Sequence, residues 1–125
     1  MKKVFSTSNA PAAIGPYSQA VEVNGMVFIS GQTPMDPATG KLVEGGVKEQ
    51  AEQCFKNIKA ILKEADLTTD NIVKTTVFLG DMSYFADMNE VYAKQFEGTF
   101  PARSAIAAKG LPLNCMVEIE VIAIR

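Results

Sequence analysis

The sequence contains no histidine, and this absence excludes several kinds of active site. Ser-His-Asp triads, Cys-His dyads, histidine general bases and most zinc sites all need an imidazole. The two cysteines, Cys54 and Cys115, have neither a CxxC nor another metal-ligand spacing, so we expect no metal site. Any acid–base chemistry must therefore come from carboxylates, tyrosine, lysine, cysteine, water or the backbone.

Basic clusters and nucleotide-binding motifs are also missing. The longest basic pairing is Lys2-Lys3, the formal net charge is −2 and the pI is about 5.1. Nucleic-acid binding normally needs a basic face, so we expect no nucleic-acid partner. The sequence has no GxGxxG, P-loop, EF-hand or HExxH motif, which leaves nucleotide, calcium and zinc-protease functions without support.

Long apolar runs are the third absence. No stretch approaches the ~18 residues that a membrane span needs. The first residues lack the apolar segment of about 7–15 residues that marks a signal peptide. From these observations we expect a reduced, cytoplasmic protein without membrane contacts.

The features that are present predict one domain over residues 1–125, a length that suits a single core. The clearest helix covers residues 47–65, where apolar side chains recur at three- and four-residue steps. Asn24-Gly25, between two β-type runs, predicts a type I′ hairpin turn. The other predicted elements are strands at residues 3–7, 17–24, 26–31, 71–80, 102–109 and 116–124, and a helix capped by Asp81 or Ser83 that ends near Phe96.

This order of elements predicts an α+β fold, a two-layer sandwich in which two helices cover one face of a mixed sheet. The last strand is apolar on both of its faces. Its two sets of apolar side chains are Val117, Ile119, Val121 and Ala123 on one face, and Met116, Ile122 and Ile124 on the other. Because two helices cover only one sheet face, we expect the other face to be covered in a symmetric homo-oligomer.

Glu118 and Glu120 interrupt this apolar strand on one face, about 7 Å apart. A carboxylate inside a strand is costly to bury unless it is paired or functional. The pair is therefore either a salt-bridge or interface pair, or it includes a general base or a carboxylate that holds water. A short connection from the preceding strand would bring Arg103 near, either to bind a substrate carboxylate or to pair with one of the glutamates.

Three residues in the first half of the chain are weaker candidates. Tyr17 fits either the core or a site, and Ser30 fits either a turn or a site. Gly31 permits a close backbone approach. Taken together, these residues predict a small oligomeric α+β protein with a candidate acid-binding site.

Five segments, taken together and in order, resemble the RidA (YjgF) family of reactive intermediate deaminases. Each segment alone is modest, but their combination is highly specific and covers nearly the whole chain. The segments are NAPAAIGPYSQA at residues 9–20, FISGQ at 28–32, IVKTTVFL at 72–79, PARS at 101–104 and VEIE at 117–120.

The resemblance implies a chorismate-mutase-like fold and a homotrimer whose three sheets form a central barrel, with ligand clefts between subunits. It implies hydrolysis of 2-iminobutanoate and 2-iminopropanoate to 2-oxo acids and ammonia, without a cofactor. These imines arise from enamines that pyridoxal-phosphate-dependent dehydratases release, so the reaction would remove reactive intermediates.

Residue roles follow from the same resemblance. Arg103 would hold the substrate carboxylate, and Glu118 would orient or deprotonate the attacking water. Tyr17 would line the cleft at the alkyl end of the substrate. Ser30 and Gly31 would contact the substrate largely through their backbone.

The resemblance also covers two further positions. Asn89 matches a cleft residue on the second helix. Ala105 stands where many relatives carry a cysteine, and it can offer only a backbone contact. Imine hydrolysis needs no thiol nucleophile, so the activity is still expected, whereas functions ascribed to that thiol are in doubt.

Two other functions remain as alternatives. One is a non-catalytic module on the same fold that binds small carboxylates or serves regulation. The other is an RNA-directed role, which the acidic pI and the missing basic stripe disfavour.

Overall fold

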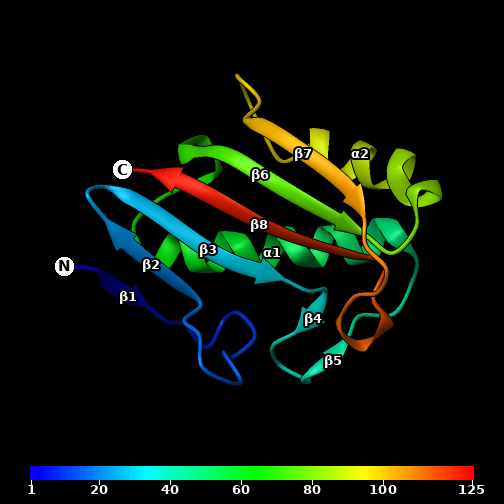
Figure 1. Ribbon diagram of the computed structural model, residues 1–125, viewed down its shortest axis with the longest axis horizontal. Helices are drawn as coiled ribbons and strands as arrows, with labels where there is room; N and C mark the ends of the chain where they lie inside the picture. Colours follow the sequence, from blue (N-terminus) through cyan, green and yellow to red (C-terminus); the bar gives the residue numbers. More distant parts are fainter.

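The computed structural model describes residues 1–125. Its centre is a six-stranded mixed sheet with the order β1-β2-β3-β8-β6-β7 (Figure 1). Neighbouring strands are antiparallel except β6 and β7, which are parallel. The strands are Lys3–Phe5 (β1), Ala20–Val23 (β2), Met26–Gln32 (β3), Ile72–Leu79 (β6), Ala102–Ala107 (β7) and Val117–Ile124 (β8).

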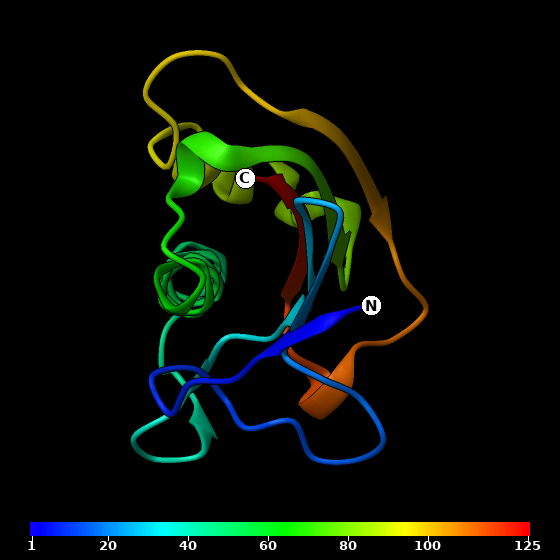
Figure 2. The same ribbon diagram turned by 90° about the vertical axis from the view of Figure 1, so that its left-hand side faces the viewer.

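Two helices, Val47–Glu64 (α1) and Phe85–Ala93 (α2), pack on one face of this sheet and bury the core against it. Figure 2 shows α1 as a layer on one side of the sheet. The predicted α+β architecture is therefore confirmed. Neither helix combines the length and the apolarity that a membrane crossing would need.

The long helix follows from its sequence. It begins after Gly46, whose backbone N–H donates to Glu49 Oε1 at 2.8 Å, and an acidic residue in the first turn suits the helix dipole. Cys54 is fully buried, as predicted. The apolar side chains that α1 buries against the sheet are Val47, Ala51, Cys54, Phe55, Ile58, Ile61 and Leu62.

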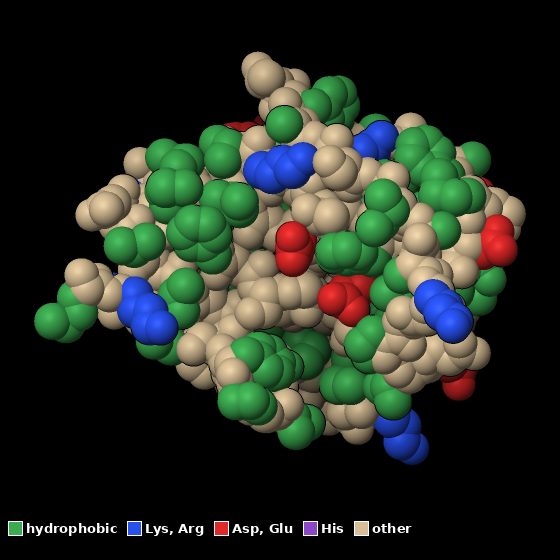
Figure 3. All heavy atoms as spheres, in the orientation of Figure 1, with side chains coloured by type: hydrophobic (Ala, Val, Ile, Leu, Met, Phe, Trp, Pro, Cys, Tyr) green, Lys and Arg blue, Asp and Glu red, His purple; other side chains and the backbone are tan.

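The alternation of β8 leaves one side of the sheet without a cover. Its odd-numbered residues from 117 to 123 are buried beneath the helices. Glu118, Glu120, Ile122 and Ile124 point to the opposite side, which we call the open face. Figure 3 shows acidic side chains near the middle of this face, with apolar side chains around them.

One predicted neighbour relationship is wrong. The last two strands do not lie side by side, because β6 lies between β7 and β8. Helix α2 connects β6 to β7, and a helical crossover of this kind produces parallel pairing. The chain then passes the end of β6, where Ala108 donates to Leu79 O and Gly80 donates to Met116 O.

Several predicted boundaries also change. β2 begins at Ala20, so Tyr17 lies in the loop before it. The predicted loop around residues 34–46 contains a small hairpin of Met35–Asp36 (β4) and Lys41–Leu42 (β5). The turn at Asn24-Gly25 is confirmed, with φ of 51° and 78°.

The second helix is shorter than predicted. Asp81 does act as a cap, but of a 3₁₀ turn at Met82–Tyr84, where its Oδ1 accepts from Ser83 N at 2.8 Å. The α-helix itself ends at Ala93 rather than near Phe96.

Candidate functional site

Glu118 is a half-buried carboxylate on the open face, and no basic side chain pairs with it. The two ion pairs of the chain are Lys48–Glu90 and Arg125–Glu22. Burial raises the pKa of the Glu118 carboxyl, and the nearby charge of Glu120 raises it further. A carboxylate in this state binds a proton more readily than an ordinary glutamate.

A bulge in the neighbouring strand makes room for Glu118. Ile29 pairs with Val121, but Gln32 already pairs with Ile119, so Ser30 and Gly31 together face one residue of β8. A Cβ atom at Gly31 would overlap the Oε2 atom of Glu118 and lie 3.0 Å from its carboxyl carbon. Glycine therefore lets the carboxylate lie against the backbone, and a larger residue here would make the end of the Glu118 side chain shift.

The loop that carries Tyr17 is fastened by a buried glutamine. Gln19 Nε2 donates to Pro11 O at 2.7 Å and to Thr7 O at 3.0 Å, and its Oε1 accepts from Thr7 N at 2.7 Å. These bonds hold the loop beside the C-terminal end of β3. The Tyr17 side chain is 53% exposed, which rules out the core interpretation.

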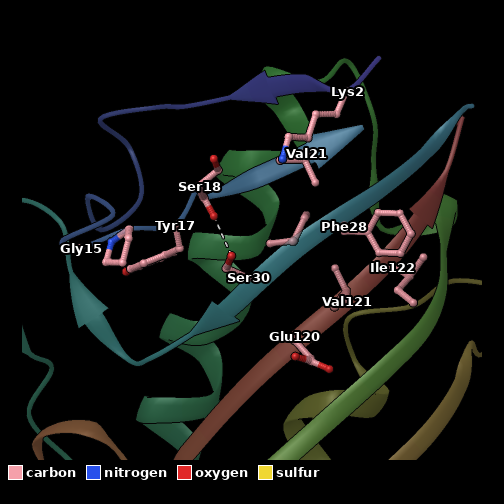
Figure 4. A pocket seen from close by; sticks show the side chains of 12 residues that line it. Lys2, Gly15, Tyr17, Ser18, Val21, Phe28, Ser30, Glu120, Val121 and Ile122 are labelled. Atoms are coloured by element: carbon pink, nitrogen blue, oxygen red, sulfur yellow. Dashed lines mark hydrogen bonds between the residues drawn. The ribbon is translucent and has the colours of Figure 1, made fainter. Parts of the chain in front are cut away.

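Ser30 links the same loop to β3. Its hydroxyl donates to Ser18 O at 2.6 Å, and its backbone N–H donates to Gln19 O at 2.9 Å (Figure 4). The hydroxyl proton is thus already engaged in a hydrogen bond within the chain, while the hydroxyl oxygen can still accept a hydrogen bond.

Two hollows meet around these residues on the open face. One has a volume of about 730 Å³ and the other about 510 Å³. Tyr17, Ser30 and Glu120 line both, and Gly31 and Glu118 line the second. The larger hollow is not the one that contains Glu118, and we regard the smaller as the candidate site because the carboxylate lies in it.

Arg103 lies on the other side of the sheet. Its Cα is in register with that of Thr75, and Thr75 is in register with Val121, so all three side chains share the helix-covered face. Arg103 Nη1 donates to Asn89 Oδ1 at 2.7 Å. Both residues line a third hollow of about 520 Å³ beside α2, together with Phe100.

The predicted site residues therefore form two groups within one chain. Tyr17, Ser30, Gly31 and Glu118 gather on the open face. Arg103 and Asn89 gather beside α2, and Ala105, which is partly buried, points to the same side as Arg103. The expectation that Arg103 pairs with a glutamate or shares a pocket with Glu118 inside one chain is wrong, because β6 separates their strands and the two side chains leave opposite faces.

Sequence reasoning missed a set of buried amide side chains that fasten the loops around the site. Asn57 Nδ2 donates to Thr33 O at 3.0 Å and to Met35 O at 2.9 Å, and Gln50 Oε1 accepts from Met116 N at 2.8 Å. A signal was present, since both amides lie on the inner stripe of α1 among apolar residues.

Comparison with known proteins places this geometry in a family. Residues 7–125 match the sequence model of the family described as endoribonuclease L-PSP. The mouse protein named 2-iminobutanoate/2-iminopropanoate deaminase is 52% identical over 125 residues, which are 100% of this chain and 93% of that protein.

Solved structures agree with the sequence relatives. YyfA from Yersinia pestis, described as a member of the conserved Rid protein family, is 49% identical with a TM-score of 0.97 over 100% of both chains. E. coli TdcF, solved with bound serine, is 44% identical with a TM-score of 0.94 over 98% of both chains. On these grounds the chain belongs to the RidA (YjgF) family, whose sequence model carries the endoribonuclease L-PSP description.

Proposed function

We propose that this chain is a deaminase that hydrolyses 2-imino acids, such as 2-iminobutanoate and 2-iminopropanoate, to 2-oxo acids and ammonia. The observation that carries the proposal is the half-buried Glu118, which has no basic partner in the chain and lies against Gly31. The name of the mouse relative supports the substrate class. The serine in TdcF supports a small ligand with a carboxylate next to a nitrogen-bearing carbon.

The reaction begins with water at the imine carbon. Glu118 takes a proton from the water while the oxygen forms a bond to the carbon of the protonated imine, which gives a neutral carbinolamine. The protonated Glu118 then returns this proton to the nitrogen. The C–N bond breaks, and the departing ammonia takes the hydroxyl proton, so that the 2-oxo acid and an ammonium ion are released and Glu118 is ionised again. A raised carboxyl pKa suits both halves of this cycle, because the group serves first as a base and then as an acid.

Arg103 supplies the complementary contact in this proposal. A guanidinium binds a planar carboxylate through two parallel hydrogen bonds, and Asn89 is the one side chain of the chain that accepts from Arg103. The remaining N–H groups are thus available for the substrate carboxylate. Tyr17 would bound the alkyl end of the substrate, and the backbone at Ser30, Gly31 and Ala105 would contribute further contacts.

Because Arg103 and Glu118 leave opposite faces of one sheet, one chain does not bring them together. We therefore propose that the site forms between chains of a homotrimer, with Arg103 of one chain facing Glu118 of the next. Packing of three open faces into a central barrel would also remove Ile106 and Ile124, which are exposed in the single chain, from water. The fold would then be the chorismate-mutase-like trimer.

The proposed role in the cell follows from the substrate. Free 2-imino acids are electrophilic, and their hydrolysis would protect other enzymes from the products of pyridoxal-phosphate-dependent dehydratases. We propose that the protein works as a single domain over residues 1–125, in the cytoplasm, without a cofactor or a nucleic-acid partner.

A coupled assay tests the activity. A threonine dehydratase generates 2-iminobutanoate in the presence of semicarbazide, which traps the imine. We expect the protein to divert the imine from the trap to 2-oxobutanoate, and Arg103→Ala to lose this effect while it keeps its fold and assembly. Full activity of Arg103→Ala would contradict the assignment. Binding of 2-oxo acids without any acceleration would favour the non-catalytic module instead.

A further inference from the structure

The guanidinium of Arg103 lies on an aromatic surface built by α2. Its Cζ atom is 4.6 Å from the ring centre of Tyr92 and 5.3 Å from that of Phe85. Asn89, from the same helix, accepts one of its hydrogen bonds. Aromatic faces attract a cation without neutralising it, unlike a carboxylate partner. The guanidinium is therefore held in place while its charge stays available for an anion.

Tyr92 is itself fixed from three sides. Its hydroxyl and Thr75 Oγ1 share a hydrogen bond of 2.7 Å, and Thr75 is fully buried in β6. Phe55 lies edge-on to the Tyr92 ring, with ring centres 5.7 Å apart. Phe96 lies 5.0 Å from the ring at a tilt of 46°. The ring has little freedom to turn away from Arg103.

Thr75 and Arg103 occupy registered positions on adjacent parallel strands, so the same threonine stands beside the arginine and holds the ring under it. We infer that Tyr92, locked by Thr75, is a positioning residue that presents the Arg103 guanidinium in one orientation to the carboxylate of the ligand. This inference rests on the proposed function, in which Arg103 binds that carboxylate. It adds a specificity element, because a fixed planar fork favours planar carboxylates over other anions.

The first test needs no ligand. The chain has two arginines, Arg103 and Arg125, so the side-chain Nε–H region of a ¹⁵N–¹H spectrum contains two signals at most. Arg125, which forms an ion pair with Glu22, serves as the internal reference. In Tyr92→Leu we expect the Arg103 signal to move toward the position of a free arginine and to exchange faster with water. The Arg125 signal should not change.

Phe5→Leu is the matched control. It removes a buried aromatic ring from β1, at the edge of the sheet opposite β7, and this ring takes no part in holding Tyr92 or Arg103. Both variants lose core packing, yet the control should keep the Arg103 signal in place. If the two variants give the same spectrum, or if Tyr92→Leu leaves the Arg103 signal unchanged, the inference is wrong whatever the protein catalyses.

The second test measures binding and turnover. We expect Tyr92→Leu to raise the Kd for 2-oxobutanoate, and the KM for the imine, by about fivefold, since ordering one freed long side chain on binding costs about 1 kcal/mol. The kcat should change by less than about twofold, because the water-activating carboxylate is untouched. An effect on kcat alone would contradict a positioning role.

The hydroxyl is tested by variants that preserve the shape of the core. Thr75→Val and Tyr92→Phe each remove the shared hydrogen bond, and both should weaken 2-oxobutanoate binding to a similar extent. The double variant should bind no worse than either single one, because the same bond is lost in all three. Thr75→Ser keeps the hydroxyl and should restore the affinity. If the losses of affinity in the two single variants add in the double variant, or if Thr75→Ser does not restore the affinity, the Thr75–Tyr92 hydrogen bond does not position Arg103. If the wild-type protein bound no 2-oxo acid, the proposed function would fail, and the spectrum would still decide the positioning.

Discussion

The Glu118 carboxylate lies directly against the backbone of Gly31. The Glu118 carboxylate lies where the Cβ of any other residue at position 31 would be, and the bulge in β3 brings the two together. The backbone of one strand thus shapes the site of a carboxylate on its neighbour. This relationship ties the catalytic proposal to a feature that single substitutions can test.

Gly31→Ala should displace the Glu118 carboxylate and lower kcat for imine hydrolysis on the order of 10²-fold, since a shift of about 1 Å has this effect on a positioned group. The coupled dehydratase assay measures it. Gly110→Ala is the control, because a Cβ there meets nothing within 4 Å. Wild-type kcat in Gly31→Ala would contradict the role of Glu118.

The dependence of kcat/KM on pH should report the protonation of Glu118. Only the ionised form accepts a proton from water, so activity should fall as the pH drops through the raised pKa of this group. Glu120 contributes to that raised pKa by its charge. Glu120→Gln should therefore move the acidic limb of the profile to lower pH. An unmoved limb would show that another group is being titrated.

The stability of the fold should also depend on the ionisation of Glu118, but it should fall as the pH rises, whereas activity should rise. Because the folded state raises the Glu118 pKa, its contribution to stability is full below the ordinary value of 4.5 and is lost as the pH rises through the folded-state pKa. Glu118→Gln should accordingly be more stable than the wild type at neutral pH, and this difference should vanish below about pH 4.

Urea unfolding at the two pH values measures this difference. Glu52→Gln, on the exposed side of α1, controls for the loss of one negative charge. Lower stability of Glu118→Gln at neutral pH would show that the carboxylate is stabilised by an interaction that this account does not contain.

Much of the fold could be predicted because the periodic patterns are long. The stripe of α1, the turn at Asn24-Gly25 and the alternation of β8 each appear within one element. Local patterns do not specify which strands pair. The placement of β7 beside β6 depends on the crossover through α2, and the sequence of the 102–109 segment carries no sign of it.

For the site, too, features within one strand could be predicted, whereas the spatial relationship between strands could not. Glu118 stood out as a charge in an apolar strand, and Gly31 as a point of close approach. The separation of Arg103 from Glu118 could not be predicted, because it follows from strand order and from the face on which each side chain leaves the sheet. No sequence pattern distinguishes Thr75 and Tyr92 from ordinary core residues, and only their contacts with each other and with Arg103 do so.

The most direct test of the account is complementation between two inactive variants. Arg103→Ala and Glu118→Gln should each abolish turnover as pure assemblies. After the two are unfolded together and refolded, random mixing should restore about one quarter of the wild-type activity, because about three quarters of the trimers are mixed and each mixed trimer contains one intact interface out of three. Recovery at this level would support a site shared between chains. If the mixture stays as inactive as its components, although mass spectrometry shows mixed assemblies, Arg103 and Glu118 do not act together across the interface and the account is contradicted.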